Sequence, residues 1–290
     1  MASDTELTDP RELLDEGWRV RLQDDRHDLA HDYFARSLEM ARLQADHQAI
    51  GKALLAVANN LPWHPTPETE NPDFSLDPLF AEAMENFQAA GDESGVAATL
   101  RSQHRNDESL EICRRIGDRV GIVRNLSALG NRAGFGNSME QMRAGSEATG
   151  KYVAQIRVFH TEAIATARDL GDREVLADAL RFAGTSWPDD KNRRRQMLLE
   201  AAELYRELGY RRDRAQAFMI CAKLACDDDL ALQEQLFADA IAIWQELGRH
   251  STEAVCIKNL AEIAQERGDQ SRADSLRARA QELQNLPESA

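Results

Sequence analysis

The histidines are the first residues in this sequence whose types and spacing could support chemistry. His27 and His31 lie four residues apart and would share one face of a helix, with Asp24 and Asp28 nearby. Zinc sites need three or four ligands in a closed geometry, and no ligand beyond these four residues is evident. We therefore expect no metal ion.

Two further histidines allow a pocket or acid–base interpretation. His64 follows Trp63 in a proline-rich segment, and His104 occupies a position where related segments of the chain carry a small residue. An aromatic ring beside an imidazole can build a binding site. The alternative is that Trp63 anchors a loop and that His104 fills space in a shortened helix, and we favour this alternative.

Motifs of known enzyme classes are absent from the sequence, which contains no nucleophile elbow and no HExxH helix. The glycines of "GNRAGFGNS" (130–138) follow an expected helix rather than a strand, which is the wrong context for a phosphate loop. We therefore expect no catalytic residue and no cofactor. Arg193, Arg194 and Arg195 could form a small anion patch, but cations in a first helical turn oppose the helix dipole, so solvated side chains are favoured.

The elements that position these residues should be helices, because Ala, Leu, Glu and Arg are abundant while proline and glycine are few. A helix–glycine–helix corner recurs, as in "LGDREVLADALRFAG" at 170–184 and "IGDRVGIVRNLSALG" at 116–130. Glycine just past a helix end takes the left-handed conformation, and the Asp that often follows can cap the next helix. The corners align at Ala45, Gly91, Gly117, Gly171, Gly209 and Gly248.

Positions counted from each corner carry residues of recurring size, which predicts one packing face per helix. Six positions after the corner the residue is small, namely Gly51, Ala97, Val123, Ala177, Ala215 and Ala254. Nine positions after it the residue is large, namely Leu54, Leu100, Leu126, Leu180, Phe218 and Ile257. Thirteen positions after it the residue is small except at His104, namely Ala58, Gly130, Gly184, Ala222 and Ala261. Four before it come Ala41, Phe87, Cys113, Ala167, Tyr205 and Trp244, expected on the inner face of the entering helix.

Successive corners are 46, 26, 54, 38 and 39 residues apart, and a period near 34–40 with two helices per unit is typical of α-solenoids. Near the C-terminal end the chain carries Asn259, Leu260, Ala261, Gly268, Asp269, Ala273 and Ala280 at the spacing of tetratricopeptide repeats. The chain resembles this family, most closely over 254–287 and, as degenerate repeats with Leu-Gly-Asp turns, over 28–253. The resemblance implies an all-α, right-handed α-solenoid of about six to seven antiparallel helix pairs in a single domain, 1–290. Asp9 and Pro10, in the arrangement favoured at helix starts, predict an N-terminal helix at 9–25.

Two segments depart from the regular period. Five prolines in 59–78 cannot continue a helix and predict a long surface loop. A short 26-residue unit precedes a 54-residue unit that contains 134–152. Since the two together span two average repeats, a displaced boundary explains their lengths as well as a functional insertion does, and we favour the boundary.

The resemblance also implies where a partner binds, because the first helix of each pair lines the concave surface in this family. The residues beside the packing face there include a set of cations and amides, which are Lys52, Asn59, Arg101, Arg105, Arg124, Asn131, Arg181, Lys223 and Lys258. A groove of one sign of charge attracts the opposite charge, and Arg can hold a carboxylate through two hydrogen bonds. For each residue taken alone, the alternative is an ordinary helix face exposed to solvent. Taken together, the residues predict an acidic ligand.

Charge and composition limit the other function classes. A formal charge of −15 argues against nucleic-acid binding, which draws its affinity from Lys and Arg. No run reaches the ~20 apolar residues that span a bilayer, and no signal peptide is evident, so we expect a cytoplasmic chain with no membrane partner. The four cysteines are expected to be buried and reduced.

The sequence thus predicts a non-enzymatic adaptor module that binds an acidic or C-terminal peptide segment of another protein in its concave groove. A ligand- or peptide-sensing regulator, with 59–78 and 134–152 as lids, is the first alternative. An enzyme built on a helical-repeat scaffold, with His64 or His104 as acid or base, is the second. The sequence leaves the oligomeric state and the identity of the partner open.

Overall fold

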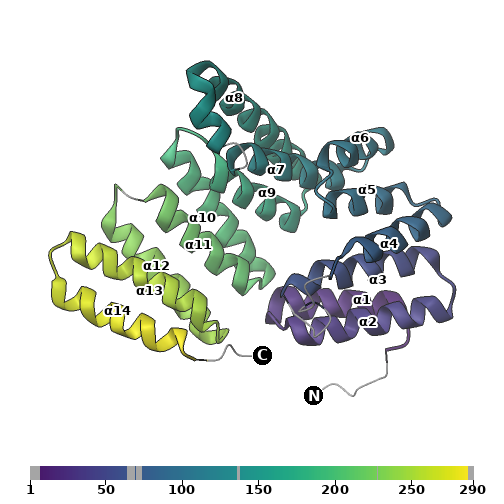
Figure 1. The fold of residues 1–290 in the computed structure, drawn as a ribbon, viewed down its shortest axis with the longest axis horizontal. Helices are drawn as coiled ribbons and strands as arrows, with labels where there is room; N and C mark the ends of the chain where they lie inside the picture. Colours follow the sequence, from purple (N-terminus) through teal and green to yellow (C-terminus); the bar gives the residue numbers. More distant parts are fainter. Residues whose placement is uncertain (1–6, 64–68, 70–73, 136–137, 227, 287–290) are drawn as a thin grey trace. The chain divides into compact units, whose positions relative to one another are not determined.

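The computed structural model describes residues 7–63, 69, 74–135, 138–226 and 228–286, with backbone only for Trp63, Phe135 and residues 138–149. This part of the chain is all-helical and contains no strand (Figure 1). Its helices are α1 (Pro10–Arg19), α2 (His27–Leu43), α3 (His47–Asn60), α4 (Asp77–Ala89), α5 (Glu93–Ser102), α6 (Asn106–Ile116), α7 (Arg119–Phe135), α8 (Ser138–Leu170), α9 (Arg173–Ser186), α10 (Lys191–Leu208), α11 (Arg211–Ala225), α12 (Leu230–Glu246), α13 (His250–Glu266) and α14 (Gln270–Gln284).

Two short elements interrupt the series. A π-helical turn (Val20–Asp24) follows α1, so the expected helix at 9–25 is α1 plus this turn. The helix begins as predicted, because the Asp9 carboxylate accepts a hydrogen bond from the Arg11 backbone N–H and Pro10 occupies the first turn. A 3-10 turn (Leu61–Trp63) follows α3.

The chain divides into two compact units, residues 1–125 and 126–289, with the division inside α7. In each unit, helices that follow one another in the sequence pack side by side. The odd-numbered helices also meet one another: α3 contacts both α1 and α5 in the first unit, and α9 contacts α11 in the second.

The predicted corners are confirmed, because every one of them is left-handed. Their φ values run from 53° at Ala45 to 76° at Gly209. At Gly117 the backbone N–H of Asp118 bonds to the Cys113 carbonyl at 2.9 Å, and the Asp118 carboxylate then caps α7 at the Gly121 N–H. His104 makes a further corner at φ 62° that the sequence did not predict, since a non-glycine residue rarely takes this conformation.

The predicted packing face is confirmed in nearly every copy. All the small residues six positions past the corner are buried, as are all the residues four positions before it. The small residues allow close approach: a Cβ added at Gly51 would lie 2.8 Å from the Phe87 ring, and one at Gly130 would lie 2.6 Å from the His160 ring. The exceptions are Phe218, which is half-buried, and His104, which lies in a turn.

The displaced-boundary interpretation of the irregular units is wrong. The 26-residue unit is a real pair of short helices, α5 and α6, of 10 and 11 residues. The following unit is long because α8 alone has 33 residues. The segments expected as lids, 59–78 and 134–152, fall partly outside the described residues, and so does His64.

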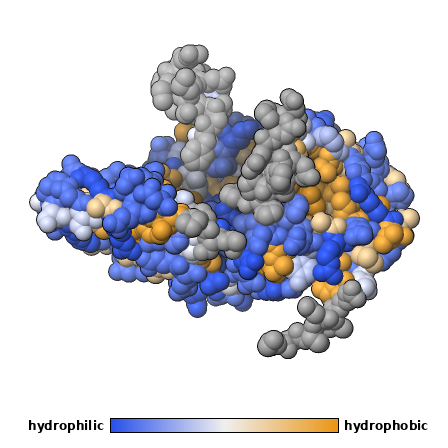
Figure 2. All heavy atoms as spheres, turned by 60° about the horizontal axis from the view of Figure 1, so that its bottom comes forward, coloured by the Kyte–Doolittle hydropathy of each residue, from blue (hydrophilic) through white to orange (hydrophobic). Residues whose placement is uncertain are grey.

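The surface is mostly hydrophilic on the face drawn in Figure 2, with apolar side chains in separate areas. The most exposed large apolar side chains are Leu43 on α2 and Val158 on α8. None of the described helices combines the length and the apolar character that a membrane crossing requires.

Candidate functional site

The predicted groove residues occupy the odd-numbered helices with one exception. The first unit holds Lys52 and Asn59 on α3, Arg101 on α5 and Arg124 on α7, and the second holds Asn131 on α7, Arg181 on α9, Lys223 on α11 and Lys258 on α13. Arg105 is the exception, because α5 ends at Ser102 and the position lies in the turn before α6. There Arg105 forms a two-pronged ion pair with Glu108, at 2.7 and 2.5 Å.

Arg181 lies on α9, but its charge is neutralised within the fold. Its Nε donates to the Tyr205 hydroxyl at 3.0 Å, and the Tyr205 hydroxyl donates to Asp178 at 2.6 Å. Burial alone would lower the pKa of Arg181, but Tyr205, Asp178 and Asp213 together outweigh it and raise that pKa above its usual value. The guanidinium also lies 4.5 Å from the Phe182 ring centroid. Arg181 therefore has a structural role between α9 and α10.

Arg101, unlike Arg181, has no such partner in the described part of the fold. Its side chain is half-buried and forms no ion pair or hydrogen bond with the described residues. Burial and, to a smaller degree, the positive charge of Arg124 on α7 lower the pKa of Arg101 to about 10. Two guanidinium groups that repel each other at one place would both be stabilised by an anion.

The lysines of the predicted set are exposed and, among the described residues, unpaired. They are Lys52, Lys223 and Lys258. Several arginines of the even-numbered helices differ, because carboxylates on neighbouring even-numbered helices pair with them. Such pairs are Arg42–Glu82 between α2 and α4, Arg168–Glu200 between α8 and α10, and Arg272–Glu234 between α14 and α12.

The two predicted amides lie in different surroundings. The Nδ2 of Asn59 donates to the Ser102 hydroxyl at 3.3 Å. The Oδ1 of Asn131 is shielded from solvent and accepts no hydrogen bond from the described residues.

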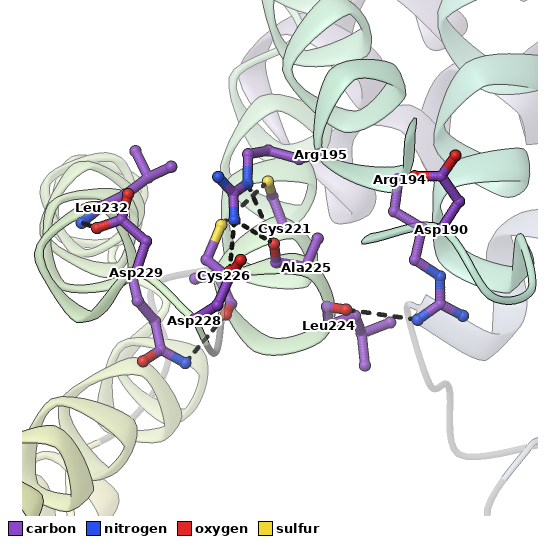
Figure 3. A network of polar contacts seen from close by, with 12 residues as sticks. Asp190, Arg194, Arg195, Cys221, Leu224, Ala225, Cys226, Asp228, Asp229 and Leu232 are labelled. Atoms are coloured by element: carbon purple, nitrogen blue, oxygen red, sulfur yellow. Dashed lines mark hydrogen bonds and ion pairs between the residues drawn. The ribbon is translucent and has the colours of Figure 1, made fainter. Parts of the chain in front are cut away.

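The solvated interpretation fits Arg193, which is exposed, but it is wrong for Arg194 and Arg195, which donate hydrogen bonds to backbone carbonyls. Arg193 lies 4.0 Å from the Trp187 ring centroid, and the Nε of Arg194 donates to the Trp187 carbonyl at 2.6 Å. Arg195 donates to the Ala225 carbonyl from both Nε and Nη2, at 3.1 and 2.9 Å (Figure 3). The first turn of α10 lies beside the carbonyl ends of α9 and α11, whose partial negative charge attracts cations.

The cysteines are buried free thiols, as predicted. Cys221 and Cys226 lie beside Arg195, with their sulfur atoms 3.8 Å apart (Figure 3). Burial raises the pKa of both thiols and raises that of Cys256 to about 12, so all three stay protonated near neutral pH.

His27 belongs to a buried polar cluster. Its Nε2 lies 3.1 Å from Asp25, its Nδ1 lies 3.3 Å from the Oδ1 of Asn60, and Asn60 donates in turn to the His27 carbonyl at 2.9 Å. This cluster ties the start of α2 to the end of α3. No group of three potential metal ligands occurs among the described residues.

A cavity of about 660 Å³ in the first unit brings together residues that sequence reasoning missed. It lies where the ends of α3 and α5 meet the start of α4, and its lining is Ala58, Asn59, Pro62, Leu76, Asp77, Phe80, Ser102, Gln103, His104 and Arg105. The sequence indicated this cavity only through His104, which departs from the small-residue pattern. Asp77 and Gln103 could not be predicted to line it, because only the packing of α4 against α5 brings them together.

Comparison with known proteins gives no family. No family model and no curated protein matches the chain. Among solved structures, the chain is similar to the crystal structure of BtubC (BKLC) from P. vanneervenii, with 13% identity over 97% of this chain and 93% of that one. The TM-score is 0.31, so this likeness carries no functional assignment.

Proposed function

We propose that this chain is a helical-repeat interaction module of the tetratricopeptide type, a right-handed superhelix whose odd-numbered helices line its concave side. We further propose that this side binds an acidic segment of a partner protein. Contacts between odd-numbered helices within each unit support the arrangement, because the inner helices of a curved array approach one another.

One observation carries the proposal. Arg42, Arg168 and Arg272 of the even-numbered helices are paired with carboxylates of other helices, whereas Lys52, Arg101, Lys223 and Lys258 form no ion pair among the described residues. A chain with a net charge of −15 has carboxylates to spare for every cation, so unpaired cations on one set of helices leave local positive potential there.

Arg101 and Arg124 are the proposed anchor in the first unit. Arginine binds carboxylates in a fixed two-pronged geometry, and the half-buried position of Arg101 reduces solvent screening. An incoming carboxylate would relieve the repulsion between the two guanidinium groups. Arg181 has no part in this proposal, because its hydrogen bonds to Tyr205 already use it within the fold.

The test is the fluorescence anisotropy of a labelled hexaglutamate peptide, at low and high salt, with hexalysine as the control ligand. Arg101→Met with Arg124→Met should weaken hexaglutamate binding about tenfold or more, because each charge-assisted contact contributes about 1.5–3 kcal/mol. The matched control is Arg168→Met with Arg206→Met, which removes the same charge from α8 and α10. Equal loss of affinity in both double variants would contradict the proposal, since net charge alone would then explain binding.

A further inference from the structure

Cys221 and Cys226 form a pair of thiols at the end of α11 that the proposed function does not use. Both residues are fully buried in the apolar core of the second unit, and their sulfur atoms lie 3.8 Å apart (Figure 3). Sulfur is a soft donor, and as a thiolate it binds soft metal ions. Two sulfur atoms side by side are therefore a candidate metal site.

The backbone spacing of the pair favours a metal ion over a disulfide bond. Cys226 directly follows α11, and five residues advance a helix by about 7.5 Å. Two Cα atoms more than about 7 Å apart cannot be bridged by a disulfide without backbone movement. Metal–sulfur bonds of about 2.3 Å, in contrast, hold two sulfur atoms at up to about 4.6 Å from each other. The present separation of 3.8 Å lies within this reach.

The number of ligands indicates an ion that two sulfur atoms can satisfy. Zinc takes four ligands, and the described residues contain no group of three His, Cys, Asp or Glu side chains that could hold a metal ion. The Asp228 carboxylate accepts a hydrogen bond from Arg195 at 2.7 Å instead. Cu(I) is a soft ion that thiolates select, and two thiolates are enough to bind it.

Arg195 supplies the charge that such a complex needs. Cu(I) with two thiolates carries a single negative charge, which is costly to bury without a partner. The Arg195 guanidinium lies beside both sulfur atoms (Figure 3). Burial raises the pKa of the Cys226 thiol, and this guanidinium opposes the rise. The Arg195 side chain is 21% exposed, so its movement opens a route from solvent to the sulfur atoms.

From these observations we propose that Cys221 and Cys226 bind a Cu(I) ion as a two-coordinate dithiolate, with Arg195 as the compensating charge. Each thiol releases its proton to solvent and forms a copper–sulfur bond. Copper keeps its oxidation state, so the step needs no oxidant and no reductant. The site lies within the second unit and involves neither Arg101 nor Arg124, so it does not depend on the proposed function.

Competition with a coloured Cu(I) chelator tests the proposal. The full chain, kept reduced and free of oxygen, is titrated into the Cu(I) complex of bathocuproine disulfonate. The wild type should withdraw about one Cu(I) per chain and should gain the ultraviolet charge-transfer absorption of copper–thiolate bonds. Failure of the wild type to withdraw copper would overturn the proposal without any variant. Binding of Zn²⁺ as tight as that of Cu(I) would overturn the two-coordinate assignment.

Variants then locate the copper. Cys221→Ala and Cys226→Ala should each weaken Cu(I) binding about 100-fold or more, because a lone thiolate loses the gain from a linked second ligand. The matched control is Cys256→Ala, which removes a buried thiol of the same unit and should leave binding unchanged. Far-UV circular dichroism checks that each variant folds, and Cys226→Ala, beyond the end of α11, decides if Cys221→Ala unfolds. Equal affinity in Cys226→Ala and Cys256→Ala would contradict the site. Arg195→Gln should weaken binding several-fold, and unchanged affinity would contradict the compensating charge.

Discussion

The buried imidazole of His160 should make the second unit lose stability as pH falls. His160 on α8 is fully buried against Gly130 of α7, and its Nε2 lies 2.7 Å from the Ser186 hydroxyl of α9. Since the Ser186 hydroxyl donates to the Phe182 carbonyl at 3.1 Å, its oxygen accepts from Nε2–H. The Nδ1 atom has no hydrogen-bond partner among the described residues, so a proton there would be buried without compensation.

The size of the effect follows from the pKa. Burial lowers the pKa of His160 to about 4, from the 6.5 expected of an unfolded chain. Above 6.5 neither state binds the proton, so His160 makes no pH-dependent contribution. Below 6.5 the unfolded chain binds it more readily, and the free energy of unfolding falls by about 2 kcal/mol by about pH 5 and by about 3 kcal/mol once pH is below about 4.

Urea unfolding at about pH 7.5 and about pH 5, followed by far-UV circular dichroism, measures this loss. Other titrating groups contribute equally to the wild type and to His160→Gln, a variant that keeps an N–H donor near Ser186 but cannot be protonated. The stability difference between the two proteins should therefore shift by about 2 kcal/mol in favour of the variant at the lower pH. His47→Gln, at an exposed histidine of α3, is the control and should show no such shift. Parallel pH profiles for wild type and His160→Gln would refute the reasoning.

Two further predictions concern cations that the fold uses internally. Arg195→Gln should lower the free energy of unfolding, measured in urea, by about 2 kcal/mol, because it leaves the Ala225 carbonyl without its charged donor. Arg206→Gln, at an exposed ion pair with Glu203, is the control and should change that free energy by less than about 0.5 kcal/mol. Equal losses in the two variants would contradict the capping role of Arg195. Arg279 forms an ion pair with the buried carboxylate of Glu253. Arg279→Met should lower the free energy of unfolding by about 3 kcal/mol, because it leaves that carboxylate with one fewer donor, whereas Glu253→Gln should lower it by about 1 kcal/mol, because water can solvate the half-exposed guanidinium. A larger loss for Glu253→Gln than for Arg279→Met in thermal or urea unfolding would contradict this reasoning.

The corners and the packing face were predictable because both follow from local rules. Glycine at a helix end and a small residue every second turn have the same meaning in any helical context, so Gly117 and Ala177 could be assigned without the rest of the fold. His104 shows the limit of these rules. Its left-handed conformation ends α5 early, places Arg105 in a turn and opens the cavity, and no residue preference would predict it.

The binding residues were less predictable, because partners from other helices decide whether a cation is available. Arg181 and Arg101 hold equivalent positions relative to their corners and are half-buried alike. Tyr205 of α10 bonds to Arg181, while Arg124 of α7 repels Arg101. The position in the repeat predicts the same binding role for both residues, and only contacts with the neighbouring helix show that Arg181 is already engaged within the fold.

Arginines and lysines differ in this chain in how often groups of the fold bind them. A guanidinium has five N–H donors in a planar fork, so it can satisfy the carbonyl end of a helix, as Arg195 does, or a hydroxyl and a carboxylate together. An ammonium is a compact, strongly hydrated charge that gains less from such sites and stays in water. Lys52, Lys223 and Lys258 are exposed accordingly. If the odd-numbered helices bind an acidic segment, the lysines should therefore supply salt-sensitive attraction, and geometric selectivity should depend on Arg101, whose burial sets its orientation.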